Sequence, residues 1–140
     1  MISKQSARML VDAPVDEVRA VLLDPVSLAD WNPAFLAISG RPDAVAEEEY
    51  RLTVRPGLSG TFTYTTIEPG RIGMRWSVPG FTEFGRWDIR SYYAGTEVEH
   101  GLGHHGPLAV TLAPAYRGVA RLRLSRLAEW VSGLPHHSGR

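Results

Sequence analysis

The feature that most constrains the fold of this sequence is a long stretch, residues 34–105, in which apolar and polar residues alternate. A period of two places successive side chains on opposite faces of a β-strand. Turn signals such as Glu-Pro-Gly and Ala-Gly-Thr interrupt the alternation and leave only hairpin-length connections, which favour antiparallel neighbours. The strands predicted in this way are residues 34–41, 47–55, 60–68, 71–78, 81–93 and 96–105. One face of such a sheet is apolar and aromatic, and the other is charged.

Two short helices are predicted before these strands. Residues 5–12 form a plausible first strand, and Pro14 and Pro25 then stand where the first turn of a helix tolerates proline. Asp12 and Asp24 precede these prolines and are candidate N-caps. The sequence Trp-Asn-Pro ends the second helix, because the residue before a proline is biased away from helix.

Residues 107–133 are predicted to form one long helix, with a break or kink at Pro114 near its start. An apolar stripe at helical spacing runs along this segment: Ala120, Leu124, Leu127 and Val131. Three arginines fall on its solvent side: Arg117, Arg121 and Arg126.

The predicted fold class is therefore α+β: a curved antiparallel sheet of about seven strands, two short N-terminal helices and one long C-terminal helix. The helix would cover the apolar face of the sheet. Because a single helix cannot fill a strongly curved sheet, a cavity is expected between them.

Composition narrows the class of protein. The 140 residues contain no cysteine, and Lys+Arg and Asp+Glu both total 15. These counts exclude thiol chemistry and argue against binding to duplex nucleic acid, which favours a basic surplus. No run approaches the ~20 apolar residues of a membrane span. We expect a single cytoplasmic domain over residues 1–133 and a disordered tail over residues 134–140.

The stretches VDAPVDEVRAVLLDPVSLADWNP and GTEVEHGLGHHGPLAVTLAPAYRGVARLRLSRLAEW resemble the START/Bet v 1-like (SRPBCC) superfamily. Within it, the sequence is most similar to the bacterial polyketide cyclase/dehydrase and lipid-transport group. The resemblance runs from Val11 to about Val131 and implies a helix-grip fold with a deep internal cavity. The resemblance implies no particular set of catalytic residues, because members of the group place different residues in the cavity.

Four residues are candidates for acid–base chemistry: His100, His104, Glu83 and Tyr64. The two histidines share the apolar face, but four residues of strand separate them by roughly 13–14 Å, too far to chelate one metal ion. Glu83 either points inward, where burial would raise its pKa, or is turned to the surface by a bulge at Gly85. The alternative for each histidine is a structural role, either as a hydrogen-bonded side chain or at the rim of the cavity.

The leading functional hypothesis is binding of a small hydrophobic molecule (aromatic, polyketide-like or lipid) inside the cavity. The predicted ligand contacts are Trp31, Tyr50, Tyr64, Met74, Trp76, Glu83, Trp87, His100, His104 and Tyr116. The entrance would lie where residues 56–60, 79–82 and 103–116 meet.

Two other functions remain open: a cofactor-independent cyclase, aromatase or dehydratase, and a co-chaperone-like module that binds proteins. No cofactor, metal, nucleic acid or stable membrane insertion is expected, and the chain would be a monomer or homodimer. The sequence GLGHHG matches the letters of a dinucleotide-binding fingerprint. That fingerprint requires a strand after the helix that follows it, and no such strand is predicted here.

Overall fold

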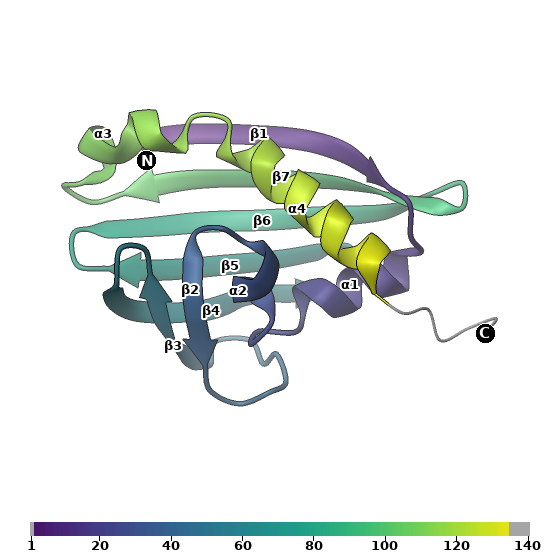
Figure 1. The fold of residues 1–140 in the computed structure, drawn as a ribbon, viewed down its shortest axis with the longest axis horizontal. Helices are drawn as coiled ribbons and strands as arrows, with labels where there is room; N and C mark the ends of the chain where they lie inside the picture. Colours follow the sequence, from purple (N-terminus) through teal and green to yellow (C-terminus); the bar gives the residue numbers. More distant parts are fainter. Residues whose placement is uncertain (1, 135–140) are drawn as a thin grey trace.

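The computed structural model describes residues 2–134 as one seven-stranded antiparallel sheet with helices on one face (Figure 1). The strand order is β1-β7-β6-β5-β4-β3-β2. The strands are β1 (Ile2–Val11), β2 (Phe35–Ser39), β3 (Glu49–Val54), β4 (Leu58–Glu68), β5 (Arg71–Val78), β6 (Phe81–Tyr92) and β7 (Gly95–His105). The helices are α1 (Val15–Leu22), α2 (Leu28–Trp31), α3 (Ala109–Leu112), the 3₁₀ turn η1 (Ala113–Tyr116) and α4 (Val119–Gly133). The predicted fold class is confirmed.

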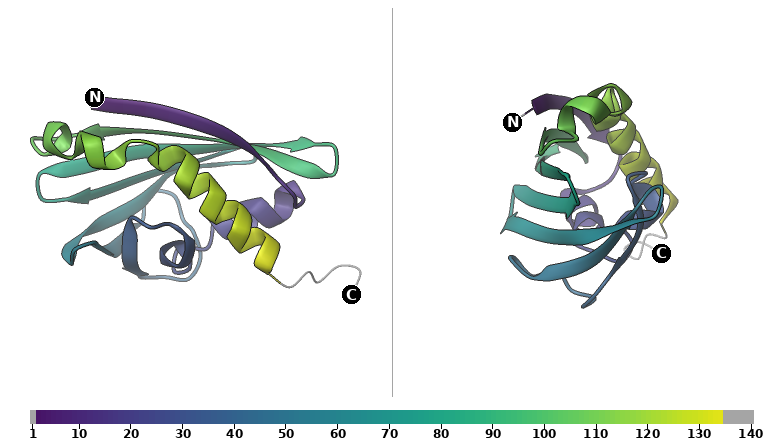
Figure 2. Two further views of the ribbon diagram at one scale, coloured as in Figure 1. Left: turned by 45° about the horizontal axis from the view of Figure 1, so that its top comes forward. Right: turned by 90° about the vertical axis from the view of Figure 1, so that its left-hand side faces the viewer.

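The sheet curls around α4, which crosses its concave face diagonally (Figures 1 and 2). Helices α1 and α2 lie beside the same face, near the C-terminal half of α4. At the opposite end of α4, the α3 and η1 segment lies next to the start of β1. The two ends of the curved sheet are therefore covered by different helical segments.

The predicted strands match the observed ones to within about three residues at each end, and β5 matches over its whole length. The largest difference lies in β1, which is predicted from residue 5 but begins at Ile2. Strand β2 is predicted over residues 34–41 but ends at Ser39. Gly40 follows with φ of 153° at the point where the ring of Tyr50 packs against it, and the chain leaves the sheet there. The predicted tail lies outside the described residues except for Leu134.

The predicted caps of the first two helices are wrong. Pro14 itself occupies the N-cap position of α1, and no side chain makes a capping hydrogen bond there. The second helix begins at Leu28 rather than at Pro25. Residues 25–27 form a turn instead, in which the Ser27 hydroxyl donates to the Asp24 carbonyl at 3.2 Å.

The predicted long C-terminal helix is divided into α3, η1 and α4. Pro114 lies in η1, so the predicted break near the start is confirmed, and Gly118 then adopts a left-handed φ of 76° before α4 begins. The Gln5 side chain of β1 spans this break: its amide nitrogen donates to the Tyr116 carbonyl at 2.7 Å, and its oxygen accepts from the Ala120 N–H at 2.9 Å. The backbone groups freed by the break are thereby satisfied.

The register of β6 decides the orientation that the sequence left open for Glu83. Gly85 pairs with Leu102 of β7 and with Met74 of β5 in an unbroken register, so no bulge rotates the strand. Glu83 therefore points to the concave side and is only 3% exposed. A register shift is found instead in β1, between Ile2 and Gln5.

The core is built from the inward residues of the sheet and the apolar stripe of α4. Ala120, Leu124, Leu127 and Val131 are all buried, as their spacing predicts. Among residues 2–134, no helix is both long and apolar enough to cross a bilayer.

Candidate functional site

A cavity of about 450 Å³ lies at one end of the concave face, between the sheet and the α3–η1–α4 segment. This volume is within the range of small-molecule sites. All three segments expected at the entrance contribute to it, through Leu58, Phe81 and Tyr116. The complete lining is Pro33, Ala34, Val54, Arg55, Leu58, Trp76, Val78, Phe81, Leu112, Ala115, Tyr116, Val119, Leu122 and Arg123. Only two of these side chains are charged, so the walls are mainly apolar.

A buried ion pair borders this cavity. Arg123 of α4 is 1% exposed and forms a two-point contact with the carboxylate of Glu83 on β6: Nη1 to Oε2 at 2.6 Å and Nη2 to Oε1 at 3.0 Å. Charge-assisted pairs of this fork geometry are among the strongest hydrogen bonds in proteins. The pair joins the sheet to the helix across the concave face.

His104 of β7 completes the environment of the carboxylate. Its Nε2 lies 2.9 Å from Glu83 Oε1. Because the ionised carboxylate can only accept, Nε2 is the donor, and Nδ1 has no hydrogen-bond partner. The His104 ring packs against two cavity-lining side chains, with ring centroids 4.6 Å from Phe81 and 4.3 Å from Tyr116.

His100 is held as a neutral ring. Its Nδ1 donates to the Arg86 carbonyl at 2.9 Å, and its Nε2 accepts from Arg123 Nη1 at 3.3 Å. The ring also stacks on Trp87, with a centroid separation of 3.7 Å and an interplanar angle of 11°. Burial and the positive charge of Arg123 lower the pKa of His100 to about 3.

The pKa of Glu83 moves in the direction opposite to the rise predicted from burial. Burial alone would raise that pKa, but the Arg123 charge and the hydrogen bonds from His104 and Arg123 outweigh it and hold the pKa well below its usual range. The carboxylate therefore stays ionised, with both oxygens engaged.

Three buried polar atoms at this end of the molecule lack a hydrogen-bond partner: Trp76 Nε1, Arg123 Nε and His104 Nδ1. Trp76 and Arg123 line the cavity, and His104 contacts its wall through Phe81 and Tyr116. An unpaired buried polar atom costs free energy, which a suitable ligand would recover.

Of the ten predicted ligand contacts, Trp76 and Tyr116 line the cavity, and Glu83, His100 and His104 form the polar cluster around Arg123. The structure does not bring the other five to the cavity wall: Trp31, Tyr50, Tyr64, Met74 and Trp87. They pack in the core farther along the sheet, where the Tyr64 hydroxyl donates to the Leu22 carbonyl at 2.7 Å. Burial raises the pKa of Tyr64, so its proton is strongly held. Their roles in binding or catalysis stay predictions.

Arg123 is the site residue that sequence reasoning missed. Arginines on a predicted surface helix are normally solvated, and Arg117, Arg121 and Arg126 are indeed exposed. The signal was its position: Arg123 lies three residues after Ala120 and four before Leu127, within the buried stripe. Its partner, Glu83, points inward from the facing sheet, and the sequence alone does not show that the two side chains meet.

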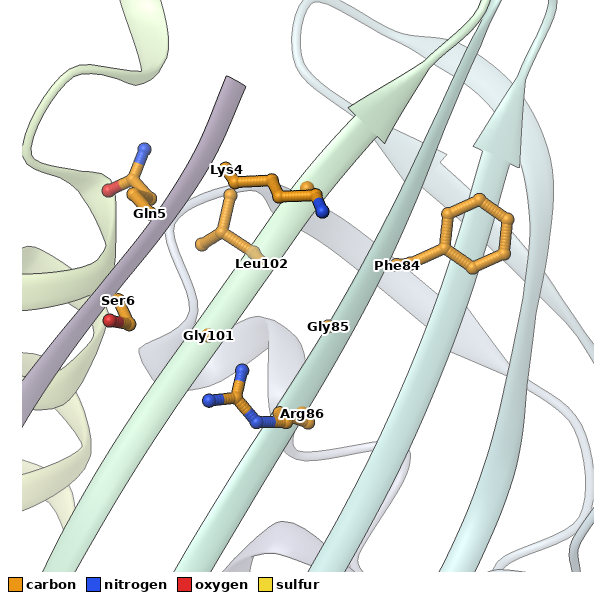
Figure 3. A pocket seen from close by; sticks show the side chains of 9 residues that line it. Lys4, Gln5, Ser6, Phe84, Gly85, Arg86, Gly101 and Leu102 are labelled. Carbon is orange, nitrogen blue, oxygen red and sulfur yellow. The ribbon is translucent and has the colours of Figure 1, made fainter. Parts of the chain in front are cut away.

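A second hollow, of about 640 Å³, lies on the face of the sheet opposite α4 (Figure 3). Gly101 and Gly103 contribute no side chains to this hollow, and the Arg86 guanidinium lies over Gly101, where a Cβ atom would clash with Nη1. Arg86 is already paired with Asp88. No buried unpartnered atom belongs to this hollow, so the concave cavity is the stronger candidate site.

The family model of polyketide cyclase/dehydrase and lipid transport proteins matches residues 4–131, nearly the whole chain. The chain belongs to this family. None of the curated proteins compared with the chain matches it.

Solved structures support the same fold. The chain is similar to the ZhuI aromatase/cyclase from Streptomyces sp. R1128, with 16% identity, a TM-score of 0.74 and 97% of each chain covered. A START superfamily protein from Mycobacterium smegmatis is 15% identical, with a TM-score of 0.76 over 94% of this chain and 99% of that one. DynU16, a protein of the dynemicin biosynthetic locus, is 20% identical, with a TM-score of 0.66; the match covers 95% of this chain but only 48% of DynU16. At these identities the likeness establishes the fold alone.

Removing one partner of the buried ion pair should destabilise the protein more than removing both. Arg123→Met leaves the Glu83 carboxylate buried without its cation, a change that typically costs about 3–5 kcal/mol. In Glu83→Gln/Arg123→Met no buried charge remains, so the double variant should be more stable than Arg123→Met alone. Urea unfolding of the four proteins of the cycle measures the coupling. A double variant that loses the sum of the two single losses would contradict the pairing.

His100 should make stability depend on pH in the acid range. A folded-state pKa of about 3, below the ordinary 6.5, means that the unfolded chain binds the proton first. The free energy of unfolding is therefore retained above pH ~6.5 and falls by up to about 1.4 kcal/mol per pH unit as the pH drops toward 3. His100→Gln should have a shallower slope in urea unfolding between pH 6 and pH 5. Equal slopes would show that His100 is not held neutral.

Proposed function

We propose that this protein binds a small, mainly apolar molecule in the concave cavity. The observation that carries the proposal is the 450 Å³ apolar space whose wall includes two buried donors without partners, on Trp76 and Arg123. Burial of apolar ligand surface would supply most of the affinity, and the donors would fix the orientation.

The polar cluster indicates which ligand group the cavity would accept. The Arg123 charge is neutralised by Glu83, and His100 is neutral, so the site has no spare cation for a carboxylate at its buried end. A neutral acceptor oxygen, such as a ketone or quinone carbonyl, would match the free N–H of Trp76. The ligand class is thus an apolar or aromatic molecule with a carbonyl group, which is consistent with a polyketide-like compound.

Filling the cavity should abolish binding without unfolding the protein. Native mass spectrometry against a panel of aromatic, polyketide-like and lipid compounds identifies a ligand, and titration calorimetry measures its Kd. Ala115 is exposed at the cavity wall, so Ala115→Phe should occupy ligand space and raise the Kd roughly tenfold or more.

Ala113→Phe is the matched control, because Ala113 lies in the same 3₁₀ turn but lines a different hollow with Lys4 and Val110. This variant should bind like the wild type. Absence of any bound compound, or equal losses in the two variants, would contradict the proposal.

A second candidate function, acid–base catalysis, is favoured by the orientation of His104. The Glu83 carboxylate holds the proton on Nε2 and leaves the Nδ1 lone pair free, an arrangement that suits a general base. The reaction class would be proton abstraction next to a carbonyl, as in cyclisation or dehydration of a poly-β-ketone. The name of the aromatase/cyclase among the similar structures supports this candidate.

Product formation from a poly-β-ketone thioester tests this second function. His104→Gln should lower the rate about 10²–10⁴-fold. Tyr64→Phe serves as a control, because the Tyr64 hydroxyl is already bound to the Leu22 carbonyl. An unchanged rate in His104→Gln would exclude His104 as the base.

A further inference from the structure

The segment that covers the cavity is apolar on both of its sides. This lid segment, residues 106–118, contains no charged residue before Arg117. Leu112, Ala115 and Tyr116 line the cavity, while Leu108 and Val110 are 40% and 65% exposed. A helical segment that is apolar all round normally lies in a core or in lipid.

Exposed aliphatic side chains continue around the entrance. Leu58 on β4 is 45% exposed and Leu122 on α4 is 42% exposed, and both line the cavity. Leu108 packs over the β5–β6 turn at Gly80 and thereby joins this patch to the cavity wall. The exposed aliphatic residues at this end of the molecule come from β4, the lid segment and α4, and we call them the entrance patch: Leu58, Leu108, Val110 and Leu122. A patch of this kind usually marks an interaction surface.

The charges around the entrance patch are positive, although the whole chain has a formal charge of zero. Arg55 lines the cavity, Lys4 and Arg117 flank Val110, and Arg121 lies in the first turn of α4. Within the described residues 2–134, none of these four side chains has a hydrogen-bond or ion-pair partner.

Acidic residues are displaced from this end of the molecule. Residues 50–67, 69–82 and 101–128 contain no Asp or Glu, and Glu83 is buried. The exposed acidic residue nearest in sequence to the cavity lining is Asp30, three residues before Pro33. The strands of the opposite end instead carry paired charges, such as Arg90 with Glu97.

We propose that the entrance patch docks on the surface of a bilayer containing anionic lipids. Leu58, Leu108, Val110 and Leu122 would enter the interface between headgroups and acyl chains, while the surrounding Lys and Arg side chains contact lipid phosphates. The cavity would then open directly into an apolar phase, so an apolar molecule could enter or leave without crossing water.

A bilayer fits these features better than a protein partner does. The aliphatic residues come from three separate elements, and cations line both hollows beside them: Arg55 in the cavity, and Lys4 and Arg117 next to Val110. Such a distribution matches an extended anionic surface. Anionic headgroups can meet cations at any spacing, whereas a protein partner would need acidic side chains matched to each of them. This inference goes beyond the proposed function and holds whichever molecule occupies the cavity.

Flotation with lipid vesicles tests the docking surface. The full chain should float with vesicles of phosphatidylcholine containing about 30% phosphatidylglycerol, and much less with phosphatidylcholine alone. Binding should weaken in about 0.5 M salt, because salt screens the cation–phosphate contacts. Val110→Glu should reduce binding roughly tenfold, and Arg117→Gln/Arg121→Gln should reduce it about fivefold per arginine.

Matched controls separate docking from general effects of charge. Val26→Glu makes the same change at a valine that is 50% exposed in the turn before α2, and Arg126→Gln removes an exposed arginine farther along α4. Both controls should float like the wild type. Equal losses in Val26→Glu and Val110→Glu, or no flotation of the wild type, would overturn the proposal.

Sedimentation velocity without vesicles tests whether a second copy of this chain, rather than a bilayer, binds to the entrance patch. Self-association that Val110→Glu abolishes, in a protein that does not float, would overturn the proposal in favour of a dimer interface. Vesicle binding requires no ligand in the cavity, whereas the titration of Ala115→Phe measures ligand binding in lipid-free solution. A failure of membrane docking is therefore distinguishable from a failure of the proposed ligand binding.

Discussion

The buried contact between Arg123 and Glu83 is the interaction on which the rest of this structure depends. Burying two charges is costly, and the cost is offset here by a two-point contact and by a third hydrogen bond from His104. The contact ties α4 to β6 at one position along the concave face. Burial, together with the positive charge of the adjacent Arg123, keeps His100 neutral.

The Arg123–Glu83 contact separates two parts of the concave face, one filled by packed side chains and one hollow. On one side, Trp31 and Trp87 pack edge to face at 5.4 Å, and Tyr64 is buried with its hydroxyl bound to the Leu22 carbonyl. On the other side the same face is hollow and is covered only by the lid segment and the start of α4. The predicted aromatic ligand contacts therefore lie mostly in a packed core, and the cavity lies at the end that carries the entrance patch.

The fold was predictable because its signal is periodic and local. Alternation placed Trp76, Trp87, His100 and His104 on the correct face, and short turns implied antiparallel pairing. Alternation could not decide whether a bulge occurs at Gly85, since a glycine permits either geometry. Only the pairing of Gly85 with strands on both sides settles the orientation of Glu83.

The site was harder to predict because it depends on contacts between distant residues. Arg123 and Glu83 are 40 residues apart, and each alone has an ordinary surface interpretation. The cavity likewise depends on where the C-terminal segment breaks, at Pro114 and Gly118, which decides that Tyr116 turns toward Phe81. Family membership determines the framework of the fold, but the residues that line the cavity differ from one member to another.

We expect the buried ion pair to confine a ligand to the hollow end of the concave face. A crystal structure of the protein with a ligand identified by the screen would show where that ligand binds. Ligand density should lie between Trp76, Tyr116 and Arg123, with the Arg123–Glu83 contact intact. Density among Trp31, Tyr64 and Trp87, with that contact broken, would contradict it.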